Sequence, residues 1–219
     1  MRLNHETESA RRPRGRPQVR SDGETRALIV EAAATEFQTK GFAGACIADV
    51  AQRAGVSTKT LYRLVPNKVD LFESFVVDRI GRAVLEIEFE IGPNPDARQV
   101  IERMLIGFGE LTLEPGIIAI NRVVIGESGN FPELGRTFYA KAIMRTSQAM
   151  ERALLKLCAL GVIALEDPAE ATSMLRGMMV MDPQRAVMLG EAEAPDHDAI
   201  HARARRCARL FVEGCGTKP

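Results

Sequence analysis

The sequence lacks the patterns that mark secreted, membrane-bound or enzymatic proteins. Its four cysteines show no CxxC spacing, and it contains neither a signal-type apolar segment near its start nor an uninterrupted run of about 18 apolar residues. No GxSxG, Walker or GxGxxG motif occurs, and no nucleophile stands beside an evident base. These absences argue against catalysis. They predict a reduced, cytoplasmic protein with no cofactor and no membrane anchor.

Charge of neither sign is in excess, but the two signs are unevenly distributed. The first 68 residues hold 12 Lys and Arg against 7 Asp and Glu, whereas residues 69–219 hold 17 against 22. A basic N-terminal part on an acidic remainder is typical of a protein that meets nucleic acid at one end, and chance variation of surface charge is the alternative. The length and the 46% content of hydrophobic residues suit one sizeable core plus a small extra unit.

The stretch 47–71 reads as two short helices joined by a tight turn and followed by a third helix. Apolar residues recur at three- and four-residue spacing from Ile47 to Ala54, and Gly55 can take the positive φ that ends such a helix. Ser57 is suited to cap the next helix, in which Leu61 and Leu64 would face inward. The remaining side chains carry hydroxyl and cationic groups, which bond to phosphates and base edges. They are Thr58, Lys59, Thr60, Tyr62 and Arg63.

This arrangement resembles the TetR family of transcriptional regulators. The resemblance rests on the AGVS turn, a recognition helix ending in LY and an NK before a long apolar helix, and it extends back to the helix that holds Leu28 and Phe37. It implies a three-helix DNA-binding domain over residues 24–68 and a helical ligand-binding and dimerisation domain over residues 69–219. It also implies a homodimeric repressor that a small molecule releases from a palindromic operator.

The resemblance implies a role for each exposed residue of this element. Tyr62 and Lys68 would contact phosphates, and Thr58 to Thr60 with Arg63 would enter the major groove; Ser57 lies at the same surface. Cys46 stands where a Ser or Thr cap is usual, and we expect it to be a small buried or capping residue rather than a redox sensor. Because Lys59 and the pair Leu64-Val65 also depart from the family pattern, the operator does not follow from relatives.

Residues 1–23 are polar, contain prolines and show no periodicity, which predicts a disordered basic arm. Within them Arg14 and Arg16 flank a glycine between prolines, as in an AT-hook core. Such a strip fits the narrow minor groove of A·T-rich DNA. The alternative is a solvated tail that raises only non-specific affinity.

Caps and helical periodicity predict an all-α fold. Helices are expected over residues 24–40, 68–90, 97–113, 117–127, 132–160, from 168 with an interruption at Pro183, and over 196–213. Within the first helix, Leu28 is expected to pack inward with Ile29, Ala33 and Phe37. Asn67 with Asp70 is expected to cap the helix over residues 68–90.

The last two predicted helices carry apolar stripes, which suggest a partner. One stripe runs from Ala171 through Met174 and Met178 to Met181, and the other from Ile200 to Phe211. The resemblance implies that these helices pair with their copies in a homodimer. The alternative is that both stripes complete the core of a single chain.

Methionine and phenylalanine side chains on the middle helices could line a pocket for a small apolar or amphipathic effector, although core filling explains them equally well. Arg122 or Glu127 could anchor its polar end, or form an ion pair instead. His197 and His201 have the spacing of metal ligands, but a polar helix start is the simpler interpretation, so no metal is expected. The candidate pocket residues are Met104, Phe108, Phe138, Met144, Met174 and Met178.

Two other functions stay open from the sequence. The protein could be an architectural protein that binds A·T-rich DNA through its arm and takes no effector. It could also be a helical enzyme that uses the Met/Phe pocket, against which the missing catalytic arrangement argues.

Overall fold

The computed structural model describes residues 20–214, without the side chains of residues 82, 83, 85 and 86. Over this range the chain is helical and contains no strand, which confirms the expected all-α class. Arg14, Arg16 and most of the predicted arm lie outside the described residues.

Three helices form the head of the molecule: α1 (Asp22–Gly44), α2 (Ile47–Arg53) and α3 (Thr58–Leu64). A capping box between Ser21 and Glu24 starts α1 two residues earlier than predicted. Gly41, at φ 70°, breaks α1 where the sequence predicted its end, and one further turn follows. Leu28 is 40% exposed, so its predicted packing was wrong. Ile29 and Phe37 define the buried face, from which Leu28 is turned by about 100°.

The turn between α2 and α3 forms as the sequence indicates. Gly55 has φ 67°, and the Ser57 hydroxyl oxygen accepts a hydrogen bond from the Thr60 N–H at 3.1 Å. Leu61 and Leu64 are buried. Cys46 holds the position before α2, but its side chain is exposed and makes no capping hydrogen bond, so it is neither of the residue types expected.

Helix α4 (Lys68–Ile87) joins the head to the rest of the chain, which we call the body. Asn67 caps α4 by accepting a hydrogen bond from the Asp70 N–H, and the Asp70 carboxylate accepts one from the Asn67 side chain rather than from its backbone. Aromatic rings from α1 and α4 pack together and meet Phe131 of the body, so one hydrophobic core runs through head and body. The rings from α1 and α4 are Phe37, Phe42, Phe72 and Phe75.

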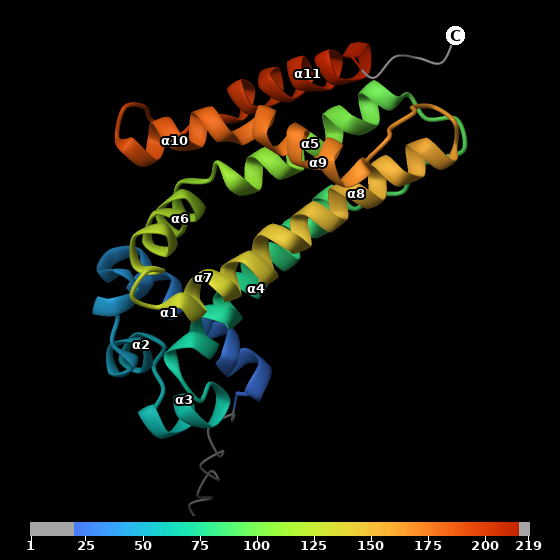
Figure 1. The fold of residues 1–219 in the computed structure, drawn as a ribbon. Coiled ribbons are helices and arrows are strands. Elements are labelled where there is room, and N and C mark those ends of the chain that lie inside the picture. Colours follow the sequence, from blue (N-terminus) through green and yellow to red (C-terminus); the bar gives the residue numbers. More distant parts are fainter. Residues whose placement is uncertain (1–19, 215–219) are drawn as a thin grey trace, which may run out of the picture.

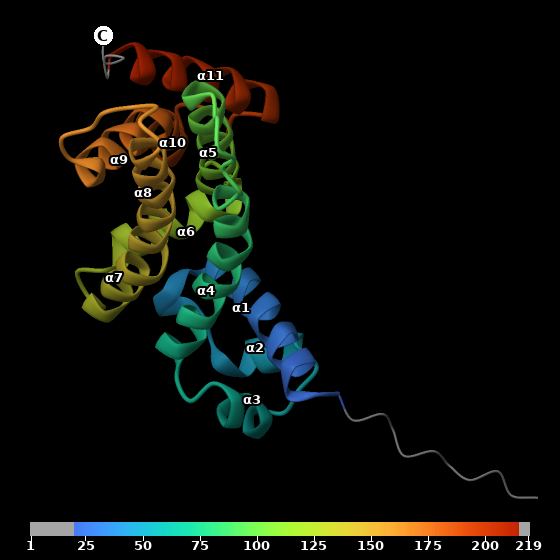
Figure 2. The same cartoon turned by 90° about the vertical axis from the view of Figure 1, so that its right-hand side faces the viewer.

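The body continues as α5 (Ala97–Thr112), α6 (Pro115–Glu127), α7 (Pro132–Phe138), η1 (Tyr139–Ile143), α8 (Met144–Ala159), α9 (Pro168–Arg176), η2 (Gly177–Met181), α10 (Asp182–Leu189) and α11 (His197–Gly214). Helices α4, α5 and α8 pack along one another, and α11 packs on α5 (Figures 1 and 2). The two views place α3 at one end of the molecule and α11 at the other.

Two body helices contain wide π-helical segments. The helix predicted over 132–160 is continuous but winds as the π-helix η1 in its middle. The interruption predicted at Pro183 is η2, and Pro183 itself lies in the first turn of α10. The helix continues from η2 into α10 without a break, and Arg203 of α11 donates to the Met178 and Met179 carbonyls, which the missing proline N–H leaves free.

The apolar stripe of α11 is covered within the chain, whereas the stripe that begins on α9 is covered only in part. Ile200 and Phe211 of α11 are buried where this helix packs on α5, as are Ala171 and Leu175 of α9 within the body. The stripe of α11 thus completes the core of the chain. Met174 and Met181 of the other stripe remain exposed, as do Leu189 and Leu210.

No single helix among the described residues is long and apolar enough to span a bilayer. The pair α5 and α6 reaches the required length and composition together, but it bends by 66°, and both helices contribute to the hydrophobic core.

A buried carboxylate ties α1 to α2. Glu36, only 1% exposed, lies 3.0 Å from the Arg53 guanidinium and 2.8 Å from the Lys40 ammonium, which also reaches Asp49 at 2.8 Å. The hydrogen bond from Lys40, followed by that from Arg53, lowers the pKa of Glu36 against the opposing effect of burial. The same partners raise the pKa of Lys40.

We predict that Glu36→Gln lowers the midpoint of thermal unfolding by about 3–8 °C at neutral pH, because a buried charged hydrogen-bond acceptor is lost. A carboxylate with a lowered pKa stabilises the fold above its ordinary pKa of 4.5, and this contribution disappears as the pH falls through the lowered value. The difference between wild type and variant, followed by circular dichroism, should therefore shrink below that pH. A difference that grows with acidity would contradict this assignment.

Candidate nucleic-acid interface and ligand cavity

Helix α3 presents a polar surface at the end of the molecule opposite α11 (Figure 1). Ser57, Thr58 and Lys59 are exposed at its start, and Tyr62 is 51% exposed one turn later. Thr60 is half-buried, and its hydroxyl lies 2.8 Å from that of Ser57. The buried Leu61 and Leu64 fix this orientation, so hydroxyl and ammonium groups face solvent together.

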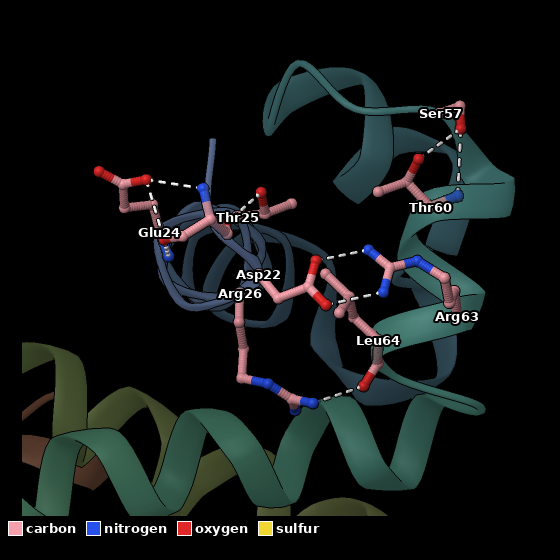
Figure 3. A network of polar contacts seen from close by, with 9 residues as sticks. Asp22, Glu24, Thr25, Arg26, Ser57, Thr60, Arg63 and Leu64 are labelled. Atoms are coloured by element: carbon pink, nitrogen blue, oxygen red, sulfur yellow. Dashed lines mark hydrogen bonds and ion pairs between the residues drawn. The ribbon is translucent and has the colours of Figure 1, made fainter. Parts of the chain in front are cut away.

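Arg63 is held by an acidic residue of α1. Both ends of its guanidinium donate hydrogen bonds to the Asp22 carboxylate, at 2.8 and 2.6 Å (Figure 3). The hydrogen bond from Arg63 lowers the pKa of Asp22, and the same contact raises the pKa of Arg63. The cation expected to enter the groove is therefore paired with an acid within the chain, and Asp22 competes with a phosphate or base for two of its donors.

Lys68, in the first turn of α4, also has partners within the chain. Its ammonium donates to the Ala43 carbonyl at 3.0 Å and lies 5.0 Å from the centre of the Phe42 ring. Desolvation by these neighbours lowers its pKa, and Glu127 opposes that shift. Lys68 thus binds the end of α1 to the start of α4, and only part of its side chain faces solvent.

Glu127, one of the candidate effector anchors, lies at the joint between head and body. Its carboxylate accepts hydrogen bonds from the N–H groups of Phe42 and Ala43, at 2.9 and 2.6 Å. The positive φ of Gly41 turns these groups toward it, and a Cβ at Gly41 would come within 2.5 Å of a Glu127 oxygen. The side chain that could have anchored a ligand instead joins the end of α6 to α1.

A half-open cavity of about 290 Å³ lies in the body, lined by residues of α4 to α10 including η1 and η2. Phe108 and Phe138, two of the expected residues, line it, with further apolar side chains that include Ile117 and Val180. Polar groups also face it. They are Asn121, Thr146, Ser173, Arg176 and Gln184, none of which was singled out from the sequence.

The other candidate pocket residues lie outside the lining of this cavity. Met104 is fully buried in the core, and Met144 and Met174 are at the surface, 37% and 58% exposed. The Met178 carbonyl accepts hydrogen bonds from Arg203 of α11, and Arg122 donates to the Val187 carbonyl of α10 at 3.0 Å. For Met144, Met174 and Met178, sequence spacing could not predict these positions because η1 and η2 rotate the faces of their helices. The position of Arg176 within a methionine-rich stretch is the sequence signal by which it could have been found.

The two histidines of α11 share one acidic partner. A Glu110 carboxylate oxygen lies 3.0 Å from His197 Nε2 and 3.2 Å from His201 Nε2, and the two rings stack at 3.8 Å. The three ligand atoms lie close enough together for one ion, but the groups are mostly exposed and already pair with one another. A polar pairing of α11 with α5 accounts for this cluster.

Comparisons with known proteins match both the head and the body to families of transcriptional regulators. Residues 29–75 match the family described as bacterial regulatory proteins, tetR family, and residues 99–214 match the AefR-like transcriptional repressor C-terminal domain. The HTH-type transcriptional regulator TtgR of Pseudomonas putida is 33% identical over 107 residues, which are 46% of this chain and 49% of TtgR. The chain thus spans about half the length of the curated relatives it matches.

Solved structures share the fold over most of their length. A TetR-family transcriptional regulator from Mesorhizobium loti has a TM-score of 0.76 at 21% identity, with 90% of this chain and 98% of that chain covered. The flavonoid-responsive regulator FrrA has a TM-score of 0.73 at 23% identity, with 90% and 100% covered. At these identities the similarity establishes the fold.

We predict that Asp22→Asn increases affinity for duplex DNA by about 2- to 5-fold at low salt, because it frees Arg63 and removes a negative charge beside it. Fluorescence anisotropy over a salt series measures the effect, which should fade as salt screens exposed charges. Glu31→Gln, a change at another exposed acid of α1, is the matched control. An equal gain in the control would show that the freed guanidinium contributes nothing.

Proposed function

Because this chain belongs to the TetR family of transcriptional regulators, we propose that it is a homodimeric repressor that a small amphipathic molecule releases from a near-palindromic operator. The family consists of regulators rather than enzymes. The observation that carries the proposal is a polar helix α3 at one end of a core that also encloses a cavity in the body. The name of FrrA, which describes that protein as flavonoid-responsive, supports a small-molecule signal.

DNA contacts divide into two kinds in this proposal. Thr58, Lys59 and Thr60 reach base edges from the first turn of α3, where a recognition helix enters the major groove. Arg63 joins them once Asp22 releases it. Tyr62 and Lys68 contact phosphates, with Ser57 at the same surface, and Arg14 and Arg16 of the arm reach the adjacent minor groove. In a dimer the two α3 helices would lie about 34 Å apart, so the operator should be an inverted repeat.

The proposed dimer forms through the helices at the end of the chain, α9 to α11. The exposed Met174, Met181, Leu189 and Leu210 support this choice, because large apolar side chains that stay exposed on neighbouring helices favour association. A two-fold axis would bring each patch onto its copy. In this arrangement, residues 24–68 serve as the DNA-binding domain and residues 69–219 as the ligand-binding and dimerisation domain.

Coupling between cavity and DNA would pass along α6. Ile117 and Asn121 line the cavity on this helix, and Glu127 at its end bonds the backbone of α1. A ligand that shifts α6 would thereby alter the orientation of the head relative to α4. Ligand and DNA then favour different orientations, so each weakens the binding of the other by the same factor.

Selection of genomic fragments by the purified protein, with the bound stoichiometry determined alongside, tests the proposal. Recovery of an inverted repeat occupied by dimers is the expected result. Enrichment of A·T-rich tracts without a repeat, abolished by removal of residues 1–23, would favour an architectural role instead.

We predict that substitutions in α3 separate base reading from phosphate binding. Lys59→Ala or Thr60→Ala should change which sequences are preferred, because these side chains meet base edges. Tyr62→Phe or Lys68→Ala should weaken binding to all sequences by about 3- to 10-fold. Competition between selected and scrambled duplexes measures both effects, with Lys156→Ala on α8 as a control. Uniform losses across all four variants would overturn the division.

We predict that Glu127→Gln weakens operator binding by about 3- to 10-fold, although α3 itself is unchanged. The neutral amide offers one acceptor for two N–H groups, so the end of α1 is held less firmly. Exchange of the Phe42 and Ala43 amide protons should become faster, as measured by hydrogen exchange. Glu191→Gln, in the exposed turn after α10, is the control. If amide exchange became faster but operator affinity stayed unchanged, Glu127 would take no part in the coupling between the cavity and DNA.

A further inference from the structure

Arg176, the last residue of α9, is the only charged side chain among the described residues that line the cavity. Its neighbours there are mainly hydrocarbon and aromatic groups, and the polar ones are uncharged amides and hydroxyls. The cavity therefore has one fixed positive charge and, in its described lining, no negative one.

Neutral contacts hold the guanidinium in place. One Nη donates to the Thr146 hydroxyl oxygen at 2.7 Å, and the guanidinium carbon lies 4.6 Å from the centre of the Phe108 ring. Thr146 is itself buried, and its hydroxyl lies within hydrogen-bond distance of the Ala142 and Ile143 carbonyls. These contacts orient Arg176 but do not compensate its charge.

Several other arginines form ion pairs. Arg53, Arg63, Arg152 and Arg205 each reach a carboxylate, and at least half of each of these side chains is exposed. Within the part of the chain that the structure describes, Arg176 has no carboxylate at ion-pair distance. Desolvation lowers its pKa to about 10, so it keeps its proton at neutral pH in surroundings that disfavour the charge.

Arg176 is half-buried, and a guanidinium that is partly removed from water without a counterion gains free energy when an anion reaches it. A carboxylate matches the fork of guanidinium donors and forms charge-assisted hydrogen bonds with them. The rest of the ligand must be apolar to replace water beside Phe108, Phe138 and Ile117. The volume of about 290 Å³ suits a short-chain or single-ring acid.

We propose that the cavity binds an amphipathic organic acid, with its carboxylate on Arg176 and its hydrocarbon part among the aromatic and aliphatic side chains. This inference rests on the proposed function, since it names the chemical class of the effector. It assigns to Arg176 the anchoring role that the sequence suggested for Arg122 or Glu127.

Isothermal titration without DNA tests the inference, with octanoate and octanamide at neutral pH as probes. The two molecules have nearly the same shape and differ in charge. Wild type should bind octanoate roughly 10- to 100-fold more tightly than octanamide, because charge-assisted hydrogen bonds add to the shared apolar contacts. Arg176→Gln should remove the preference, Arg176→Lys should keep much of it, and Arg145→Gln, at an exposed arginine outside the lining, should leave it unchanged.

Equal affinities of wild type for the two probes, tighter binding of the amide, or no binding of octanoate would overturn the inference, and the comparison in wild type holds even if a variant fails to fold. A preference that survives Arg176→Gln would overturn the assignment to this residue. DNA release is measured separately on the selected operator. Acid-selective binding that leaves the DNA complex intact would defeat the release mechanism of the proposed function while the inference stands.

Discussion

The orientation of α3 depends on how Phe42 is held between head and body. Its ring stacks on Phe37 and meets Phe72 and Phe131 edge-on, at 5.7, 5.9 and 5.3 Å between ring centres, while its N–H donates to Glu127. Aromatic pairs of this geometry add to the free energy of ordinary apolar burial. Because these contacts belong to α1, α4, α6 and the segment before α7 together, the head cannot turn without repacking the body.

Most cationic side chains of residues 20–68 form ion pairs or hydrogen bonds within the chain. Asp22 neutralises Arg63, the buried Glu36 holds Lys40 and Arg53, and Lys68 donates to a backbone carbonyl. Within residues 20–68, the formal count of cations therefore overstates the number that are free at the surface. Lys59 is the cation of α3 for which neither an ion pair nor a hydrogen bond is seen in the described structure. DNA would compete with these internal partners for Arg63 and Lys68.

Local features followed from the sequence, whereas features set by packing did not. The turn at Gly55, the cap at Ser57 and the helix start at residue 168 each depend on two to four neighbouring residues, and all three form. The exposure of Leu28 and the covered stripe of α11 depend on where distant helices lie, which periodicity does not encode. The same reason explains why Phe108 and Phe138 were found among the cavity residues while Arg176 was missed.

The two π-helical segments account for how a charged group comes to face this cavity. Ala142 and Ile143 of η1 and Gly177 and Val180 of η2 line it from two sides. Wide turns of this kind shift the register of the residues that follow or precede them, and they occur often at functional sites. Here the shift lets Thr146, just after η1, meet Arg176, just before η2, across the cavity wall. If η1 or η2 were a regular α-helix, Thr146 or Arg176 would point in a different direction. The hydrogen bond that orients Arg176 therefore depends on the π-helical backbone.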